Sequence, residues 1–210
     1  MEMMKNKKKG IYLIIDPAME EAVLLDKIAM VLGEEIVALQ IWDNFQENQN
    51  IHQLTEKICE IGHKQNVPVL INNHWELLKS TPLDGVHFDA IPEKWKEIKS
   101  EISKEHIIGL TCNNDLSLVE WAAENQLDYI SFCSLFPSTT SNSCELVSFD
   151  TIRKAKKEYS IPVFLAGGIN PQNLELIKDL DFDGIAIVSG IMEAKAPKKA
   201  IQKYRTILNQ

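Results

Sequence analysis

Short apolar segments alternate with longer segments of helical period along the chain. The short segments are almost continuously apolar, which is typical of parallel strands that are covered by helices. There are eight of them, and eight parallel strands are the number that closes a (β/α)8 barrel. Strands are therefore expected at Ile11–Ile15, Ile36–Ile41, Val67–Ile71, Gly85–Phe88, His106–Leu110, Tyr129–Phe132, Ile161–Leu165 and Gly184–Val188.

The intervening segments place apolar residues at i, i+3 and i+4, which predicts helices. Helices are expected at Glu20–Leu32, from Ile51 to the stop at Val67-Pro68, at Leu116–Asn125, at Asn170–Asp179 and at Ala196–Leu208. Asn170 can serve as an N-cap, and Pro171 is tolerated in a first helical turn. No linker or low-complexity segment interrupts the pattern. We therefore predict an α/β fold, a single TIM-barrel domain covering residues 1–210.

Composition and charge exclude several classes of function. The chain has 210 residues, of which 45% are hydrophobic, and a net charge of -8, which argues against binding to nucleic acid. The basic run from Lys5 to Lys9 is either a frayed terminal arm or a tail that attracts anions. No apolar stretch reaches the roughly 20 residues of a membrane helix, and no signal peptide is recognised, so we expect a cytoplasmic protein.

The spacing of the four cysteines and one long polar loop lead to two further expectations. The cysteines are widely spaced without a C-x-x-C pair, so a zinc site is not expected, and Cys144 is either an exposed thiol or a spectator. The segment from Cys133 to Val147 is polar and long, and it follows the sixth strand. It is interpreted either as a lid over a ligand or as a disordered loop.

Two strand ends predict a site for a phosphate group. Gly167-Gly168 follows the seventh strand and precedes a helix start, and Ser189-Gly190 follows the eighth. Glycines allow the backbone to approach an anion, and amides at a helix N-terminus favour one. The loops after strands seven and eight are a common phosphate site in this barrel. The alternative is that both glycine-containing segments are structural turns.

The chain resembles the thiamine phosphate synthase family, which includes the related thiazole tautomerases. The similar segments occur in the family's order over nearly the whole chain. They are Ile11–Asp16, Ala38–Gln40, Leu70–Asn73, Asp84–His87, Ile108–Thr111, Asp128–Ile130 with Leu135–Thr140, the glycine pair, and Val188–Ile191. The resemblance implies a transferase that joins a pyrimidine diphosphate to a thiazole phosphate, with Mg²⁺ and basic side chains stabilising the leaving pyrophosphate.

This sequence departs from the family's pattern at the pyrophosphate end. The family's Gln-x-Arg-x-Lys reads Gln40-Ile41-Trp42-Asp43-Asn44, and its Asn-Asp pair reads Asn72-Asn73. Pro92 stands where a second metal-binding Asp is expected, with Asp89 and Glu93 nearby, and Ser141 replaces a loop lysine. We therefore expect no cofactor, since the Mg²⁺ ligands are largely missing; the alternative is that Asp89 or Glu93 takes over the ligand role. The ligand-binding residues implied by the resemblance are Gln40, Asn72, Thr111 and Thr140.

Proton transfer would have to use other groups, because Thr111-Cys112-Asn113-Asn114 stands where the tautomerases carry a histidine. The candidates near strand ends are His87, His74 and Asp89. The alternative for His87 is an interior histidine with its hydrogen bonds satisfied, and the alternative for His74 is a surface or capping residue.

Trp42 and Trp75 either stack on a heteroaromatic ring or pack under a loop. We predict binding of a small phosphorylated heteroaromatic ligand, by an enzyme or by a non-catalytic sensing module. A homodimer is left open.

Overall fold

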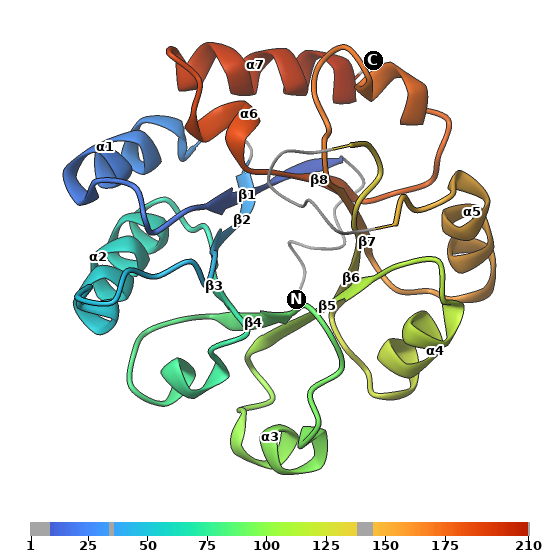
Figure 1. The fold of residues 1–210 in the computed structure, drawn as a ribbon, viewed down its shortest axis with the longest axis horizontal. Coiled ribbons are helices and arrows are strands. Elements are labelled where there is room, and N and C mark those ends of the chain that lie inside the picture. Colours follow the sequence, from blue (N-terminus) through green and yellow to red (C-terminus); the bar gives the residue numbers. More distant parts are fainter. Residues whose placement is uncertain (1–8, 34–35, 138–144, 210) are drawn as a thin grey trace.

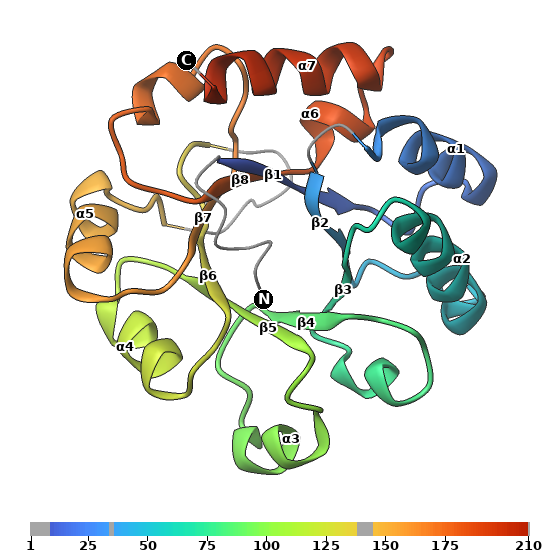
Figure 2. The same cartoon turned by 180° about the vertical axis from the view of Figure 1, so that it is seen from behind.

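Eight parallel strands form a closed barrel in the computed structural model, which describes residues 9–33, 36–137 and 145–209. The strands follow one another in chain order, and β8 pairs with β1 through Gly10 and Gly184 to close the barrel. Helices surround the strands on the outside (Figures 1 and 2). The predicted (β/α)8 fold is thus confirmed. Among the described residues, no helix is both long and apolar enough to cross a membrane.

Among the described residues, two of the crossovers between strands contain a 3₁₀ helix instead of an α-helix. These are the connections from β3 to β4 and from β7 to β8. The elements in chain order are β1 (Gly10–Ile15), α1 (Glu21–Val31), β2 (Ile36–Ile41), α2 (Ile51–Lys64), β3 (Val69–Asn72), η2 (Trp75–Lys79), β4 (Gly85–Phe88), α3 (Trp95–Glu101), β5 (Ile107–Cys112), α4 (Leu116–Glu124), β6 (Tyr129–Phe132), α5 (Phe149–Glu158), β7 (Val163–Ala166), η3 (Leu174–Ile177), β8 (Gly184–Ile187), α6 (Ser189–Met192) and α7 (Pro197–Leu208).

Alternation along the strands divides the apolar core into two layers. Successive strand residues point to opposite faces, so one set packs between strands and helices while the other fills the barrel. The outer layer contains residues such as Leu13, Ile71 and Leu165. The inner layer is smaller and aromatic, with Tyr12, Ala38, Leu70, Tyr129, Phe164, Ala166 and Ala186. The inner layer supports the polar residues that lie nearer the carboxyl ends of the strands.

The helix predicted at Asn170–Asp179 is wrong: the structure has a turn followed by the short 3₁₀ helix η3. Asparagine side chains explain the difference. Asn170 accepts hydrogen bonds from the backbone amides of Gln172 and Asn173, whereas the Asn173 side chain donates to the Gly168 carbonyl. The bonds to Asn170 are those of the predicted N-cap, whereas the bond from the Asn173 side chain holds this first turn against Gly168. This last bond ties the segment to the glycine turn instead of extending it into a regular helix.

Two helices were not predicted from the sequence, α3 and α5. Helix α3 has only seven residues, so its periodic signal is short. Helix α5 is strongly polar, with buried Ile152 and Ala155 on its inner face. Its start carries a local signal, since the Ser148 side chain accepts from the Thr151 amide. The polar segment that precedes it in the sequence obscured this N-cap.

Three aspartates form the same hydrogen-bonded arrangement at the amino ends of alternate strands of the barrel. Asp84, Asp128 and Asp183 each precede an even-numbered strand, and each carboxylate accepts from a backbone amide near the start of the preceding strand, at 2.7–2.8 Å. Each aspartate also donates its own amide to the carbonyl of that same residue. Such paired bonds set the relative position of adjacent strands at the base of the barrel.

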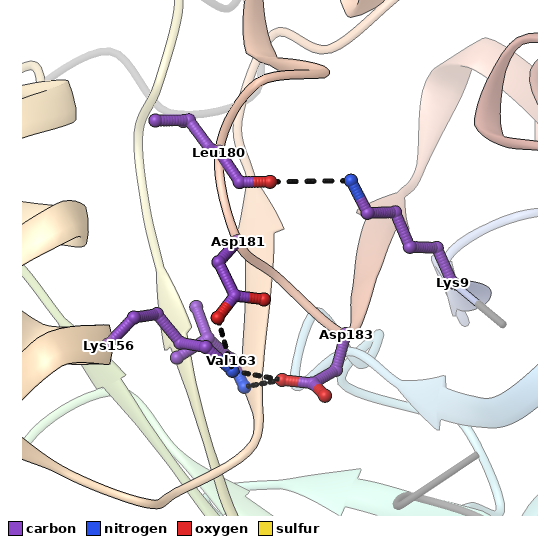
Figure 3. Close-up of polar contacts among 6 residues, drawn as sticks. All are labelled: Lys9, Lys156, Val163, Leu180, Asp181 and Asp183. Carbon is purple, nitrogen blue, oxygen red and sulfur yellow. Dashed lines mark hydrogen bonds and ion pairs between the residues drawn. The ribbon is translucent and has the colours of Figure 1, made fainter. Parts of the chain in front are cut away.

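Asp183 shows the arrangement in most detail (Figure 3). Its carboxylate accepts from the Val163 amide at 2.8 Å and from Lys156 Nζ at 3.0 Å. On the other side of the loop, Lys9 Nζ donates to the Leu180 carbonyl at 3.3 Å and lies 3.6 Å from the centre of the Phe182 ring. These contacts connect the segment before β8 to both of its neighbouring strands.

We predict that Asp183→Ala lowers the free energy of unfolding by about 2 kcal/mol, because it leaves the Val163 amide without its charged acceptor. Asp181→Ala is the matched control. Asp181 pairs with the same Lys156, but at 3.9 Å and with a side chain that is 80% exposed. The control should change stability by less than about 0.5 kcal/mol. Urea denaturation of both variants measures this, and equal effects would contradict the role given to Asp183.

Candidate functional site

A cavity of about 350 Å³ lies at the carboxyl ends of the strands, inside the barrel mouth. Every strand contributes to its wall, either through an inward-facing residue or through the loop that follows. The lining residues are Tyr12, Ile14, Gln40, Trp42, Asn72, His87, Asp89, Thr111, Tyr129, Ser131, Cys133, Phe164, Gly167, Ala186 and Val188. Polar groups gather here above an aromatic floor, as expected for a site that orients a small ligand.

A second cavity, of about 740 Å³, is larger but lies at the other end of the barrel. It is bordered by the amino ends of β5 and β6 and by residues of α3 and α4, among them Trp95, Lys99, His106 and Asp128. In barrels of this type the active site is at the carboxyl ends of the strands, while the amino ends serve stability. The mouth cavity is therefore the candidate functional site.

The structure brings together most of the side chains expected at the site. Those that line the mouth cavity are Gln40, Trp42, Asn72, His87, Asp89, Thr111 and the backbone of Gly167. Gly168, Ser189 and Gly190 are not part of its wall, although they are next to Gly167 and Val188, which are. His74 is exposed, outside the cavity, with its ring edge-on to Phe45 at 5.8 Å. Thr140 lies outside the described residues, as do Ser141 and Cys144.

Sequence reasoning identified Trp42 but missed the buried aromatic residues that form the floor of the cavity. Tyr12, Tyr129 and Phe164 are almost fully buried, and each pair of their rings has centroids 5.4–5.7 Å apart. In the sequence they appear only as apolar members of strands. Their inward orientation follows from strand parity, which becomes readable once the register of the barrel is known.

The buried polar side chains of the mouth form one continuous chain of hydrogen bonds. Thr111 Oγ1 is 2.8 Å from His87 Nε2, and His87 Nδ1 is 2.9 Å from the Tyr129 hydroxyl. The Tyr129 and Tyr12 hydroxyls are 2.7 Å apart, and Tyr12 donates to Gln40 Oε1 at 2.7 Å. Gln40 Nε2 donates to Asn72 Oδ1 at 3.0 Å, and Asn72 Nδ2 donates to the His87 carbonyl at 3.4 Å. We call this set the mouth circuit.

Burial in the mouth circuit shifts the pKa of its titratable groups. Desolvation lowers the pKa of His87 from 6.5 to about 4, and the negative charge of Asp89 only partly opposes this. Desolvation likewise raises the pKa of the Tyr12 and Tyr129 hydroxyls. At neutral pH the circuit therefore consists of uncharged groups, with His87 as a neutral imidazole.

The glycine pair after β7 adopts the conformation that its residue type suggests. Gly167 and Gly168 have φ values of 87° and 64°, in the left-handed region. A Cβ at Gly167 would lie 2.0 Å from Ser134 Oγ, so this turn packs closely against the loop after β6. Backbone bonds from Leu135 and Phe136 to the carbonyls of Ala166 and Gly167 join the two loops. The pair thus has a structural role whether or not it binds an anion.

Asn73 lies between two carboxylates at the edge of the mouth. Its Nδ2 donates to Asp43 Oδ2 at 2.7 Å and to Asp89 Oδ2 at 3.0 Å, while its Oδ1 accepts from the Asp89 amide. Asn73 has a φ of 56°, which asparagine tolerates better than most residues. Nearby, the Asn44 side chain donates to Asp16 at 3.0 Å. Amide groups thus hold the acidic residues of this edge in place.

This arrangement does not fit the Mg²⁺ site that the resemblance implies. An amide nitrogen with two hydrogens occupies the position between Asp43 and Asp89, and Mg²⁺ requires oxygen ligands arranged octahedrally. Within the described part of the chain, no group of three or more His, Cys, Asp or Glu residues could hold a metal ion.

Fold and site together define a class of protein: a (β/α)8 barrel with a polar ligand cavity at the carboxyl ends of its strands. The chain belongs to the thiamine monophosphate synthase family, whose profile matches residues 11–191. It is 29% identical over 197 residues to a thiamine-phosphate synthase of Methanobrevibacter smithii, covering 94% of each chain. A thiamine-phosphate synthase of Alkaliphilus oremlandii is 30% identical, with 93% and 94% covered.

A solved structure supports the fold. Thiamine phosphate pyrophosphorylase from Pyrococcus furiosus superposes with a TM-score of 0.80 at 21% identity, covering 95% of each chain. The resemblance proposed from the sequence segments is thus confirmed at the level of the family.

The low pKa of His87 predicts a pH-dependent stability. The imidazole protonates near pH 6.5 in the unfolded chain but only near pH 4 in the folded one, so stability is lost as the pH falls between these values. Between pH 7 and pH 4.5 this costs roughly 2.5 kcal/mol. Urea denaturation at both pH values, compared with His87→Gln, isolates the contribution. A loss of equal size in the variant would contradict it.

We predict weak Mg²⁺ binding in the native chain and a gain on Asn73→Asp. The substitution replaces the bridging amide by a third carboxylate beside Asp43 and Asp89, which creates an oxygen ligand set. Titration calorimetry with MgCl₂ should show binding at least about tenfold tighter in the variant. Asn44→Asp, which adds the same charge beside Asp16, is the control. Tight stoichiometric binding to the native chain would contradict the prediction.

Proposed function

We propose that the mouth cavity binds a small phosphorylated heteroaromatic ligand of the thiazole phosphate class and that the protein acts in thiamine biosynthesis. The observation that carries this proposal is the cavity itself, of about 350 Å³, with a polar and aromatic wall that reaches the loops after β7 and β8. Its volume suits one small ring with a short substituent. Family membership supports the link to thiamine.

The phosphate group is assigned to the loops after β7 and β8. Gly167 lines the cavity, and Val188 does so immediately before α6 begins at Ser189. Amides of a first helical turn have no partner within the helix, so they are available to an anion. We infer that Gly167, Gly168, Ser189 and Gly190 contribute backbone amides to the phosphate. The heteroaromatic ring would then lie toward Trp42 and Thr111.

The full synthase reaction is proposed to be absent or very slow. A leaving pyrophosphate needs several charge-assisted contacts, and losing one such donor commonly costs about 3 to 4 kcal/mol. No lysine or arginine is among the described residues that line the cavity. Trp42 and Asn44 occupy the positions of the family's cations, and Asn44 is engaged with Asp16. The acidic edge with Asp43 and Asp89 would also repel a diphosphate.

The second candidate is a non-catalytic module that sequesters or senses a phosphorylated thiamine intermediate. The state of His87 favours it. With its pKa lowered to about 4 and both ring nitrogens engaged in the mouth circuit, His87 is a weak proton acceptor at neutral pH. Asp89, which is exposed at the rim, is the carboxylate among the described residues of the cavity wall. Activity assays separate this candidate from an enzyme.

The proposal is tested by calorimetric binding of 4-methyl-5-(2-phosphooxyethyl)thiazole to the native chain and two variants at Ser189. Ser189→Ala keeps the backbone amide and should bind within about threefold of the native protein. Ser189→Glu places a negative charge beside the phosphate and should weaken binding by at least about tenfold. Circular dichroism of both variants checks that the fold is retained.

Several outcomes would contradict parts of this proposal. Absence of binding, or equal binding by both Ser189 variants, would remove the phosphate assignment. Supplying pyrimidine diphosphate, thiazole phosphate and Mg²⁺ tests the reaction, with thiamine phosphate detected by fluorescence after oxidation. Turnover near about one per second would restore the full synthase function. Binding without turnover favours the sensing module.

A further inference from the structure

We infer that Thr111 is a specificity-determining residue, which offers the ligand ring only a hydrogen-bond acceptor, and that His87 is the positioning residue that imposes this role. The inference rests on the proposed function, because it concerns the ring end of the same cavity. It derives from the direction of each hydrogen bond in the mouth circuit. Each hydroxyl has a single hydrogen, so fixing one end of the circuit fixes all of it.

The direction is set by a backbone carbonyl, which can only accept. Asn72 must turn its Nδ2 toward the His87 carbonyl, so its Oδ1 faces Gln40. Gln40 therefore donates through Nε2 and presents Oε1 to Tyr12, whose hydroxyl must donate. Because the Tyr12 hydroxyl donates its single hydrogen to Gln40, it can only accept from the Tyr129 hydroxyl.

The same argument fixes the tautomer of His87. The Tyr129 hydroxyl donates its single hydrogen to Tyr12, so its oxygen must accept from Nδ1–H of His87. A neutral imidazole carries one N–H, and burial keeps His87 neutral. Nε2 is then the unprotonated nitrogen, and it accepts the hydrogen of the Thr111 hydroxyl at 2.8 Å.

Thr111 is thus left with oxygen lone pairs and no hydrogen for the ligand. It lines the cavity and is only partly buried, so these lone pairs are accessible to a bound ring. Asp89, the charged side chain of the wall, is also an acceptor. A ring with an N–H group at this edge gains a hydrogen bond. A ring that presents only an acceptor or a methyl group meets an unpaired oxygen, which is unfavourable once water is excluded.

The experiment compares two phosphorylated thiazoles of nearly equal shape, the 2-amino and 2-methyl derivatives of 4-methyl-5-(2-phosphooxyethyl)thiazole. Calorimetry with the native chain should show the amino compound binding about fivefold more tightly, the ratio expected for one neutral hydrogen bond. Thr111→Val removes the acceptor while nearly keeping the volume, so the ratio should fall to about one. Thr111→Ser restores the hydroxyl and should restore the ratio.

A second measurement tests the role of His87 without any ligand. Nitrogen-15 NMR of the native protein at pH 7 should show His87 as the Nδ1–H tautomer, with Nε2 unprotonated. In His87→Phe the Thr111 hydroxyl is free to donate as well as to accept, so a ring that presents an acceptor, the 2-methoxy derivative, should gain about fivefold relative to the 2-methyl compound, a gain that the native chain should not show. A purely structural role would weaken the methoxy and methyl compounds equally and leave their ratio as it is in the native chain. If this variant does not fold, Thr111→Val and the tautomer decide the question.

The outcomes separate this inference from the proposed function. Equal binding of the two compounds to the native chain, or a ratio unaffected by Thr111→Val, overturns the role of Thr111 while phosphate binding stands. The Nε2–H tautomer overturns the direction of the circuit. Failure of both compounds to bind, together with failure of the Ser189 test, overturns the proposed function and this inference with it.

Discussion

Every polar group inside a closed barrel must find its hydrogen-bond partner among the few side chains that share the interior. The mouth circuit is how this chain meets that requirement. His87 is only 5% exposed, and Gln40 and Asn72 are 2% and 3% exposed, so an unpaired atom on any of them would be costly. Linking them in series satisfies each group and fixes its orientation. The shape, tautomer and polarity of the cavity wall all depend on this one chain of bonds.

Stability and chemistry are separated along the barrel axis. At the amino ends, Asp84, Asp128 and Asp183 each bond to the neighbouring strand, and Lys156 supports Asp183. At the carboxyl ends the aspartates are bound instead to amides, through Asn44 and Asn73. A basic side chain, Lys156, thus pairs with an aspartate at the amino ends, whereas the aspartates at the mouth are bonded only to neutral amides in the contacts described above. This distribution agrees with the absence of pyrophosphate chemistry that we propose for the mouth.

The sequence predicted the barrel well because continuous apolar strands and their number leave few alternatives. The predicted strands differ from the observed ones by at most two residues, as at Val67 and Ile161, where Pro68 and Pro162 have no backbone N–H to donate to a neighbouring strand. The inner layer was not predictable, because Tyr12 and Tyr129 are indistinguishable from outward-facing apolar residues until the register is known. The glycine turn was predicted by residue type, but its close packing on Ser134 depends on a different strand.

The two crossovers without an α-helix are four strands apart, and this spacing has a further meaning. Strands β3 and β4 with η2, and strands β7 and β8 with η3, occupy equivalent places in the first and second halves of the chain. Each pair also contains an Asp-Gly step, at Asp84-Gly85 and Asp183-Gly184, with the same backbone bonds. The barrel can therefore be described as two quasi-equivalent half-barrels with divided labour. The first carries Gln40, Asn72, His87 and Asp89, and the second carries Thr111 and the two glycine loops, so the ring end of the cavity is built by both halves, whereas the proposed phosphate end belongs to the second half alone.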